Sequence, residues 1–426
     1  MEGGSPPAAA SSDYSYDAPD LRFFVFALFF IFGGVTSLND IIIPKLKELF
    51  SLDHAEAMLV QTAFFLAYAI FSIPASALAR RFGYMRTASI GLLVMTAGCL
   101  LFIPASSGAT FPLFLMALFV LGAGITVVQV VTNPLISLLG KPQTAHSRLT
   151  FAQAFNSLGT TLFPLAGSAL ILGSLAHTDA ASLRGAALDS YRAASSRAIV
   201  HAYLGLAVAL ILVAATVWSR RNRLAERPDR HVAMFAGFSL LSRLRFAGGT
   251  LCIFLYVGAE VSIGSVIVTY LMQPQVLGAT ARDAGNHVPF YWGGALLGRF
   301  VGAYVLTRVT PGKVLAAVAT TAIALILISA NNVGAIAAWS LLAIGLTNSI
   351  MFPTIFSLAS EGLGARAAEG SGVIATAIVG GAIVPLLTGG LADASRSLSF
   401  ALCVPALCYC LIALYGIYMA RAATSG

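Results

Sequence analysis

The chain has 426 residues, of which 58% are hydrophobic and only 10% are charged. A soluble domain carries about a quarter charged residues, so the composition excludes a soluble globular protein. The formal net charge of +8 would suit nucleic acid, but the basic residues lie in short stretches between apolar runs, so no nucleic-acid partner is expected. Only helices and closed barrels span lipid, and long apolar runs are not the short alternating strands of a barrel. We therefore expect an all-α polytopic membrane protein.

The chain begins with small, polar and acidic residues that lack the basic start and apolar stretch of a signal peptide, which predicts a disordered tail over 1–20. Twelve apolar segments follow, each near the length of about 20 residues that a span requires. Their expected ranges are 22–44, 56–79, 86–105, 110–138, 149–175, 196–218, 246–272, 286–307, 312–330, 333–358, 368–391 and 397–420. The five cysteines fall within these segments without the spacing of metal ligands, so we expect free thiols and no metal site.

The basic residues are concentrated in the even-numbered loops, and the sixth loop is the longest and most basic. The smaller clusters in the second, fourth and eighth loops are Arg80, Arg81, Arg86, Lys141, Arg148, Arg308 and Lys313. The positive-inside rule places these loops and both termini in the cytoplasm. The predicted organisation is a six-helix half over 21–219, a basic cytoplasmic linker over 220–244, a second six-helix half over 245–421 and a tail over 422–426.

The two halves resemble each other in sequence. Pro134 in NPLISL and Pro353 in FPTIFSL are 219 residues apart, and Pro164 in GTTLFPLAG and Pro385 in GGAIVPLLTG are 221 residues apart. Two parallel six-helix halves joined by a basic loop are the plan of the major facilitator fold, in which the substrate site lies near the membrane midplane between the halves. The fold class we expect is therefore twelve transmembrane helices in two pseudo-symmetric halves.

Polar side chains inside the spans are the candidates for this site, because each requires a partner or a water-filled cavity. SLNDIIIP (37–44) puts Asn39 and Asp40 near the end of the first span, and Thr36 lies one helical turn before Asp40. An acid that reaches the interface is one interpretation, but the apolar run continues beyond it. We expect Asp40 to act in function, with Asn39 and Thr36 beside it.

Glu260, in FLYVGAEVSIGS (254–265), is deeper, near the middle of the seventh span, and Tyr256 lies one turn earlier on the same face. An acid at this depth is expected to be protonated or to face water and substrate. The structural alternative is an ion pair with Arg299 in the eighth span. Arg299 itself is more typical of a structural anchor than of a substrate contact.

The fourth and fifth spans carry neutral polar residues at helical spacing. In the fifth span they stand at i, i+3, i+4 and i+7, and they are Gln153, Asn156, Ser157 and Thr160, while the fourth span has Thr126, Gln129 and Asn133. Such stripes either join helices by hydrogen bonds or bind a polyol. Weaker candidates for the same site are Asn348, Tyr291, Trp292 and Tyr68. No nucleophile–base pair, phosphate loop or set of paired metal ligands occurs, so an enzyme is not expected.

Five motifs within the spans carry a family resemblance. They are LNDIIIP (38–44), QVVTNP (129–134), SRLTFAQAFNSLGTT (147–161), FLYVGAEVSIGS (254–265) and FPTIFSLA (352–359). Together they resemble the fucose:proton symporter family of the major facilitator superfamily, and more closely its glucose/galactose branch. The chain departs from the superfamily in the loop motif ASALARRFGYMR (75–86), which has Arg80 where an aspartate is usual.

The resemblance implies a sugar taken up with a proton by alternating access. It implies that Asp40 is a proton carrier or coupling acid and that Gln153 and Asn156 contact the sugar. The fucose symporter has a second membrane acid in the fourth span, where this chain has Gln129, so Glu260 is our candidate for the missing acid. Relatives coupled to sodium leave Na⁺ as an alternative to the proton.

We therefore predict a secondary active hexose importer in a bacterial inner membrane, with H⁺ as the co-transported ion and no cofactor. Its partners are a monosaccharide and the lipid bilayer, and it acts as a monomer. The alternatives are a sodium-coupled hexose symporter, an antiporter of another small metabolite on the same fold, and a sugar sensor that does not transport. The fifth span lacks the glycine–proline signature of antiporters, which argues against the second of these.

Overall fold

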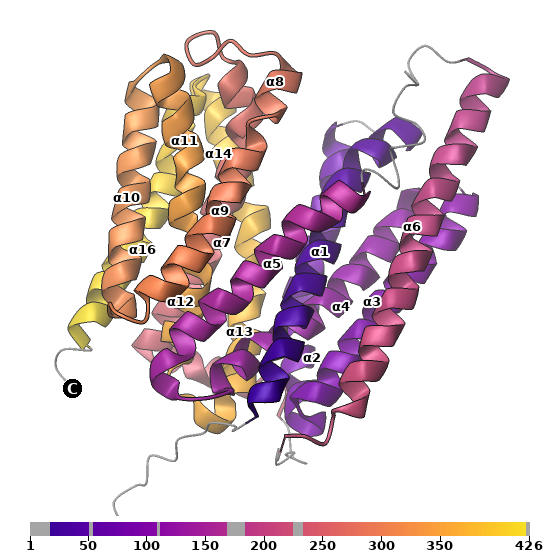
Figure 1. The fold of residues 1–426 in the computed structure, drawn as a ribbon. Coiled ribbons are helices and arrows are strands. Elements are labelled where there is room, and N and C mark those ends of the chain that lie inside the picture. The colour runs from indigo at the N-terminus through magenta and orange to yellow at the C-terminus, as the bar shows by residue number, and fades with distance from the viewer. Residues whose placement is uncertain (1–17, 51–53, 109–110, 168–183, 225–232, 423–426) are drawn as a thin grey trace, which may run out of the picture.

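The computed structural model describes residues 18–50, 54–108, 111–167, 184–224 and 233–422, and every regular element within these ranges is helical. The first six helices pack on one another, and the later helices form a second group (Figure 1). The first group, here called the N-half, consists of α1 (Pro19–Phe50), α2 (His54–Phe82), α3 (Tyr84–Gly108), α4 (Phe111–Leu138), the 3₁₀ turn η1 (Pro142–Thr144), α5 (Ala145–Gly167) and α6 (Ala186–Ser219).

The second group, here called the C-half, contains more and shorter helices. They are η4 (Ala236–Ser242), α7 (Leu244–Met272), α8 (Ala281–Gly285), α9 (Val288–Val305), α10 (Pro311–Asn331), α11 (Gly334–Asn348), α12 (Met351–Ser360), η5 (Gly364–Arg366), α13 (Ala367–Thr376), η6 (Ala377–Val379), α14 (Gly380–Ser395), α15 (Leu398–Ala401) and α16 (Cys403–Ala422). Three expected spans, 333–358, 368–391 and 397–420, are thus divided into consecutive helical pieces, which corrects their prediction as single helices.

Ten segments in the described ranges are long and apolar enough to cross a membrane. Together with α5 and α9, which carry polar or charged side chains toward the middle of the molecule, they make the twelve spans of the predicted fold class. The five cysteines are free thiols, as predicted; Cys99, Cys252 and Cys408 are buried, Cys410 is half-buried and Cys403 is exposed.

Two prolines each release a backbone carbonyl from its helix. A proline has no N–H to donate to the residue four positions earlier, so Pro134 leaves the carbonyl of Val130 free and Pro353 leaves that of Ser349 free. The Ser371 hydroxyl donates to the Val130 oxygen over 2.6 Å, and Arg299 Nε donates to the Ser349 oxygen over 3.1 Å. The two prolines differ in their effect on the helix. α4 runs through Pro134 unbroken, whereas the tenth span is interrupted between α11 and α12, about one turn before Pro353.

Within each half, a glycine allows the fifth span to pack closely against the first span of that half. Gly159 of α5 lies against the carbonyl of Phe30 in α1, and Gly380, at the start of α14, lies against the carbonyl of Phe254 in α7. A Cβ atom at either glycine would overlap that oxygen, so no other residue allows this approach. Because the two contacts join corresponding helices, the repeat seen in the prolines extends to the packing.

The first residues of each half also repeat one contact. Arg22, at the start of α1, donates from Nε to the carbonyl of Leu139 beyond α4, and Arg245, at the start of α7, donates to that of Leu358 in α12. Both bonds are 2.9 Å long. In each half an arginine therefore caps carbonyls at the end of the fourth span, where a positive charge interacts favourably with the helix dipole.

The two halves are closed against each other at the end of the bundle where α1 begins and α16 ends, the lower end in Figure 1. We call it the basic end, because Arg22, Arg80 and Arg366 lie there. The contacts that cross between the halves at this end are Arg80 to Glu369 (2.7 Å), Ser371 to the Val130 carbonyl (2.6 Å), Ser147 to the Ala303 carbonyl (2.8 Å) and Gly372 against Ser76. Toward the opposite end, the ribbons of the two halves diverge (Figure 1).

His146 lies in this closed seam, in the first turn of α5 and ahead of the fifth span. Its Nδ1 atom is buried without a hydrogen-bond partner among the described residues. Burial and the nearby Arg245 guanidinium lower the pKa of His146 from 6.5 to about 4. The neutral imidazole therefore fits the closed seam and the imidazolium does not.

We expect the folded protein to lose stability as the pH falls below about 6.5, where the unfolded His146 gains a proton that the folded one cannot hold until about pH 4. The loss is on the order of 1 kcal/mol at about pH 5.5. Thermal unfolding in detergent at several pH values should show a smaller acid-induced fall in Tm for His146→Gln than for the unmodified protein. The exposed His201→Gln is the matched control, and an identical pH profile for all three proteins would contradict the expectation.

Candidate functional site

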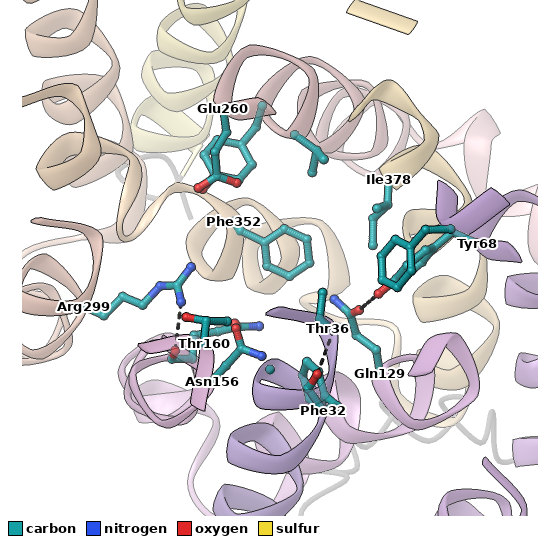
Figure 2. A pocket seen from close by; sticks show the side chains of 15 residues that line it. Phe32, Thr36, Tyr68, Gln129, Asn156, Thr160, Glu260, Arg299, Phe352 and Ile378 are labelled. Carbon is teal, nitrogen blue, oxygen red and sulfur yellow. Dashed lines mark hydrogen bonds between the residues drawn. The ribbon is translucent and has the colours of Figure 1, made fainter. Parts of the chain in front are cut away.

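A cavity of about 170 Å³ lies between the two halves. Its N-half wall is formed by α1, α2, α4 and α5, and its C-half wall by α7, α9, α12 and η6 (Figure 2). The lining residues are Phe32, Gly33, Thr36, Phe64, Tyr68, Gln129, Gln153, Asn156, Thr160, Tyr256, Val257, Glu260, Arg299, Phe352 and Ile378. The volume suits a small polar molecule and not a large ligand.

The N-half wall presents amides and hydroxyls. Tyr68 donates from its hydroxyl to Gln129 Oε1 (2.5 Å), Gln153 donates from Nε2 to Asn133 Oδ1 (3.4 Å), and Asn156 donates from Nδ2 to the Phe29 carbonyl. These bonds fix the orientation of the three amides and leave the other end of each without a partner in the described part of the chain. Nε2 of Gln129 remains as a donor, and the side-chain oxygens of Gln153 and Asn156 remain as acceptors.

The C-half wall presents an acid held by a tyrosine. The Tyr256 hydroxyl donates to Glu260 Oε1 over 2.7 Å and also lies 3.1 Å from the carbonyl oxygen of Asn348. Figure 2 shows the Glu260 carboxyl group pointing into the cavity, facing the N-half amides across it. Its second oxygen has no partner among the described protein atoms, so it is available to a ligand or to water.

Behind the acid, Asn348 joins three helices. Its Nδ2 donates to the Tyr291 hydroxyl (2.9 Å), its Oδ1 accepts from the Tyr409 hydroxyl (2.7 Å), and the Tyr291 hydroxyl lies 3.2 Å from the Glu260 carbonyl oxygen. Asn348 is fully buried and does not line the cavity. The Asn348 amide therefore supports the backbone and the tyrosine that position Glu260, instead of reaching a ligand directly.

Arg299 enters the same cavity from α9 and is anchored on both halves. Besides its bond to the Ser349 carbonyl, its Nη1 atom donates to the carbonyl of Gln153 (3.0 Å) and to the hydroxyl of Ser157, both on α5. The structural ion pair that the sequence allowed as an alternative is not formed: in the described structure no salt bridge joins Arg299 to Glu260, although both line one cavity. Arg299 is thus both an anchor and part of the wall.

The structure brings together eight of the predicted site residues: Thr36, Tyr68, Gln129, Gln153, Asn156, Tyr256, Glu260 and Arg299. Four others, Asn133, Asn348, Tyr291 and Trp292, do not line the cavity. Asn39 and Asp40 belong to α1, one turn beyond Thr36, but their side chains lie outside the described residues. Sequence reasoning missed the apolar lining residues Phe32, Val257, Phe352 and Ile378 and the supporting Tyr409, because such residues also occur throughout the lipid-facing helices.

Two helical halves that enclose a polar, ligand-sized cavity in an otherwise apolar bundle define a polytopic membrane transporter. Residues 25–385 match the model of the Major Facilitator Superfamily. The chain is 46% identical to a glucose/galactose transporter of Brucella abortus, over 92% of each chain, and 33% identical to an L-fucose-proton symporter of Escherichia coli, over 94% of this chain and 93% of that one.

The fold agrees with a solved structure of a Major Facilitator Superfamily transporter, FucP, in the outward conformation. The TM-score is 0.85 at 31% identity, and the match covers 96% of this chain and 99% of that one. The chain therefore belongs to the Major Facilitator Superfamily, within the family that includes glucose/galactose transporters and L-fucose-proton symporters, and it is not an enzyme.

We expect Asn348→Ala to destabilise the protein by about 2–4 kcal/mol, because it leaves the Tyr409 hydroxyl buried without its acceptor. Adding Tyr409→Phe should recover about 1 kcal/mol of that loss, since the orphaned hydroxyl is then removed. Denaturant or thermal unfolding of the two single variants and the double variant measures both terms. Asn331→Ala, at an exposed amide of α10, is the control, and additive losses in the double variant would contradict this network.

Proposed function

We propose that the protein is a secondary active hexose importer that carries its sugar together with a proton by alternating access. The observation that carries the proposal is the cavity itself, in which free amide groups of the N-half face an acid of the C-half. It is supported by the relatives, whose names describe glucose/galactose transport and L-fucose–proton symport at 46% and 33% identity.

The N-half wall suits a ring of hydroxyl groups. Each sugar hydroxyl both donates and accepts hydrogen bonds, so it is satisfied by a mixture of donors and acceptors. Gln129 offers a donor, whereas Gln153 and Asn156 offer acceptors, and all three are held in place by neighbouring groups. The rings of Phe64 and Phe352 line the same cavity and offer apolar surface to the C–H faces of a pyranose.

Coupling is assigned to Asp40 and Glu260. A carboxylate in a closed, dry cavity carries a large desolvation cost, and protonation removes that cost. If the sugar and the proton both favour the closed, occupied state, the two are carried together, and no covalent step is required. Sodium is the alternative coupling ion, and the experiment below separates it from the proton.

The orientation follows from the distribution of charge. The basic end carries the arginines of the even loops, so the positive-inside rule puts it in the cytoplasm together with both chain termini. The halves meet at that end, and the cavity lies on its outer side, an arrangement that suits loading from outside. We place the protein in a bacterial inner membrane as a functional monomer.

Uptake into proteoliposomes tests the function. A panel of labelled glucose, galactose, mannose, fucose and N-acetylglucosamine should give accumulation of at least one hexose under an imposed pH gradient, acid outside. A sodium gradient without a pH gradient should give none. Accumulation driven by sodium alone would replace the proton as the coupling ion, and the absence of any hexose uptake would contradict the proposed function.

We expect Gln153→Ala to weaken hexose binding about tenfold, because the acceptor it removes costs on the order of 1 kcal/mol per hydrogen bond. Isothermal titration or competition binding in detergent measures the change in Kd. Gln275→Ala, at an exposed amide outside the cavity, is the matched control and should leave Kd unchanged. An unaltered affinity in Gln153→Ala would contradict sugar binding by the polar residues of the fifth span and leave them a structural role.

For Asp40→Asn we expect loss of uphill accumulation with retention of hexose exchange down its own gradient, because a permanently neutral side chain cannot release a proton. Accumulation and counterflow are measured in the same proteoliposomes. The exposed Asp393→Asn removes a carboxylate elsewhere and should behave as the unmodified protein. Accumulation that persists in Asp40→Asn would exclude Asp40 from coupling.

A further inference from the structure

Arg299 is the residue whose bonds connect the cavity to the closed seam. From α9 in the C-half it reaches α5 in the N-half, where Nη1 donates to the Gln153 carbonyl over 3.0 Å and to the Ser157 hydroxyl. A cation inside a membrane-spanning segment usually has an acidic partner, because its burial alone is costly. Here its described partners are all neutral: a carbonyl and a hydroxyl on α5 and the carbonyl of Ser349.

The hydrogen bonds from Arg299 to α5 must break when the two halves separate at the basic end. They cross between the same two helices as the bond from Ser147 to the Ala303 carbonyl, so a separation of α5 from α9 breaks all of them together. The bond from Nε to the Ser349 carbonyl lies within the C-half and is kept. Opening therefore leaves the side chain anchored at Nε, with its Nη1 atom deprived of both acceptors.

Glu260 is the described acid that shares the cavity with that freed group. It lines the same cavity and belongs to the same half, so it moves with Arg299 when the halves separate. Figure 2 shows both side chains pointing into the cavity. One Glu260 oxygen is held by Tyr256, and neither the other oxygen nor Nη2 of Arg299 has a partner in the described structure.

The remaining groups around Glu260 are neutral. The titratable ones are the hydroxyls of Tyr256 on α7, Tyr291 on α9 and Tyr409 on α16, the last of which acts through Asn348. The neighbouring α12 and η6 contribute the apolar Phe352 and Ile378. Among the described residues, Arg299 is thus the charged group that faces Glu260.

We propose that Arg299 exchanges its α5 partners for Glu260 when the cytoplasmic end opens, and that this exchange makes Glu260 release its proton on that side. The Glu260 O–H bond breaks, the proton passes to water of the opened cavity, and the carboxylate stays paired with the guanidinium. In the closed state α5 occupies Nη1 and the acid keeps its proton. Arg299 is in this sense a positioning residue, and the inference rests on the proton-coupled function proposed above.

Arg299→Gln in proteoliposomes tests the exchange, with labelled glucose or galactose as the probe. We expect net accumulation to fall at least tenfold further than counterflow exchange with an interior at about pH 7. Raising the interior to about pH 9 should restore accumulation, since an alkaline lumen removes the proton without the guanidinium. Arg308→Gln, an exposed arginine that follows α9, is the control for the lost charge and should show neither effect.

Two further variants separate this role from a structural one. Arg299→Lys keeps a cation and should retain accumulation within about tenfold of the unmodified protein, and Glu260→Gln should show no additional loss when combined with Arg299→Gln. Equal loss of exchange and accumulation in Arg299→Gln without rescue by an alkaline interior, or additive losses in the double variant, would overturn the exchange. Failure of the unmodified protein to accumulate sugar under a pH gradient would instead contradict the proposed function.

Discussion

The structure depends on one constraint: polar and charged side chains inside an apolar bundle must either bond to one another or face a shared aqueous space. The chain meets this constraint by collecting such groups from six helices, α1, α2, α4, α5, α7 and α9, around the cavity between its halves. Each amide of the N-half wall is fixed at one end by a neighbour and left open at the other. The acid of the C-half wall is fixed in the same manner by Tyr256. The lipid-facing surface of both halves can then be apolar.

The internal repeat gives both halves the same backbone features, but these features bond to different side chains in each half. Pro134 and Pro353 each free the carbonyl four residues earlier, which is the same backbone effect in both halves. The N-half carbonyl accepts Ser371 from the other half and holds the basic end closed, whereas the C-half carbonyl accepts Arg299 and holds it at the cavity. One repeated feature therefore contributes to the seam in one case and to the site in the other.

Composition and span length were enough to predict an all-α polytopic membrane protein, because the requirement that backbone groups be satisfied in lipid leaves few alternatives, and the internal repeat added the two halves. Helical spacing put Gln153 and Asn156 on one stripe, and depth in the span singled out Glu260; all three line the cavity. Spacing also put Asn133 on the face of Gln129, but Asn133 bonds to Gln153 and does not line the cavity, because periodicity gives a face and does not say whether that face meets water or another side chain. The role of Tyr409 depends on a contact between distant segments, which spacing along one helix cannot reveal.

The N-half and C-half walls of the cavity carry different side chains at equivalent positions of the repeat. Phe30 and Phe254 make equivalent contacts and are 224 residues apart, and the same offset relates Thr36 to Glu260, both of which line the cavity. A second carboxylate at position 36 would line the same small cavity as Glu260, where each of two like charges disfavours the ionisation of the other. With a hydroxyl on one side and an acid on the other, the described cavity wall holds one carboxyl group, and it stands on the same half as Arg299. In the proposed exchange, a proton on Glu260 is controlled by the partners of Arg299, and the partners on α5 are the ones that a movement of the halves removes.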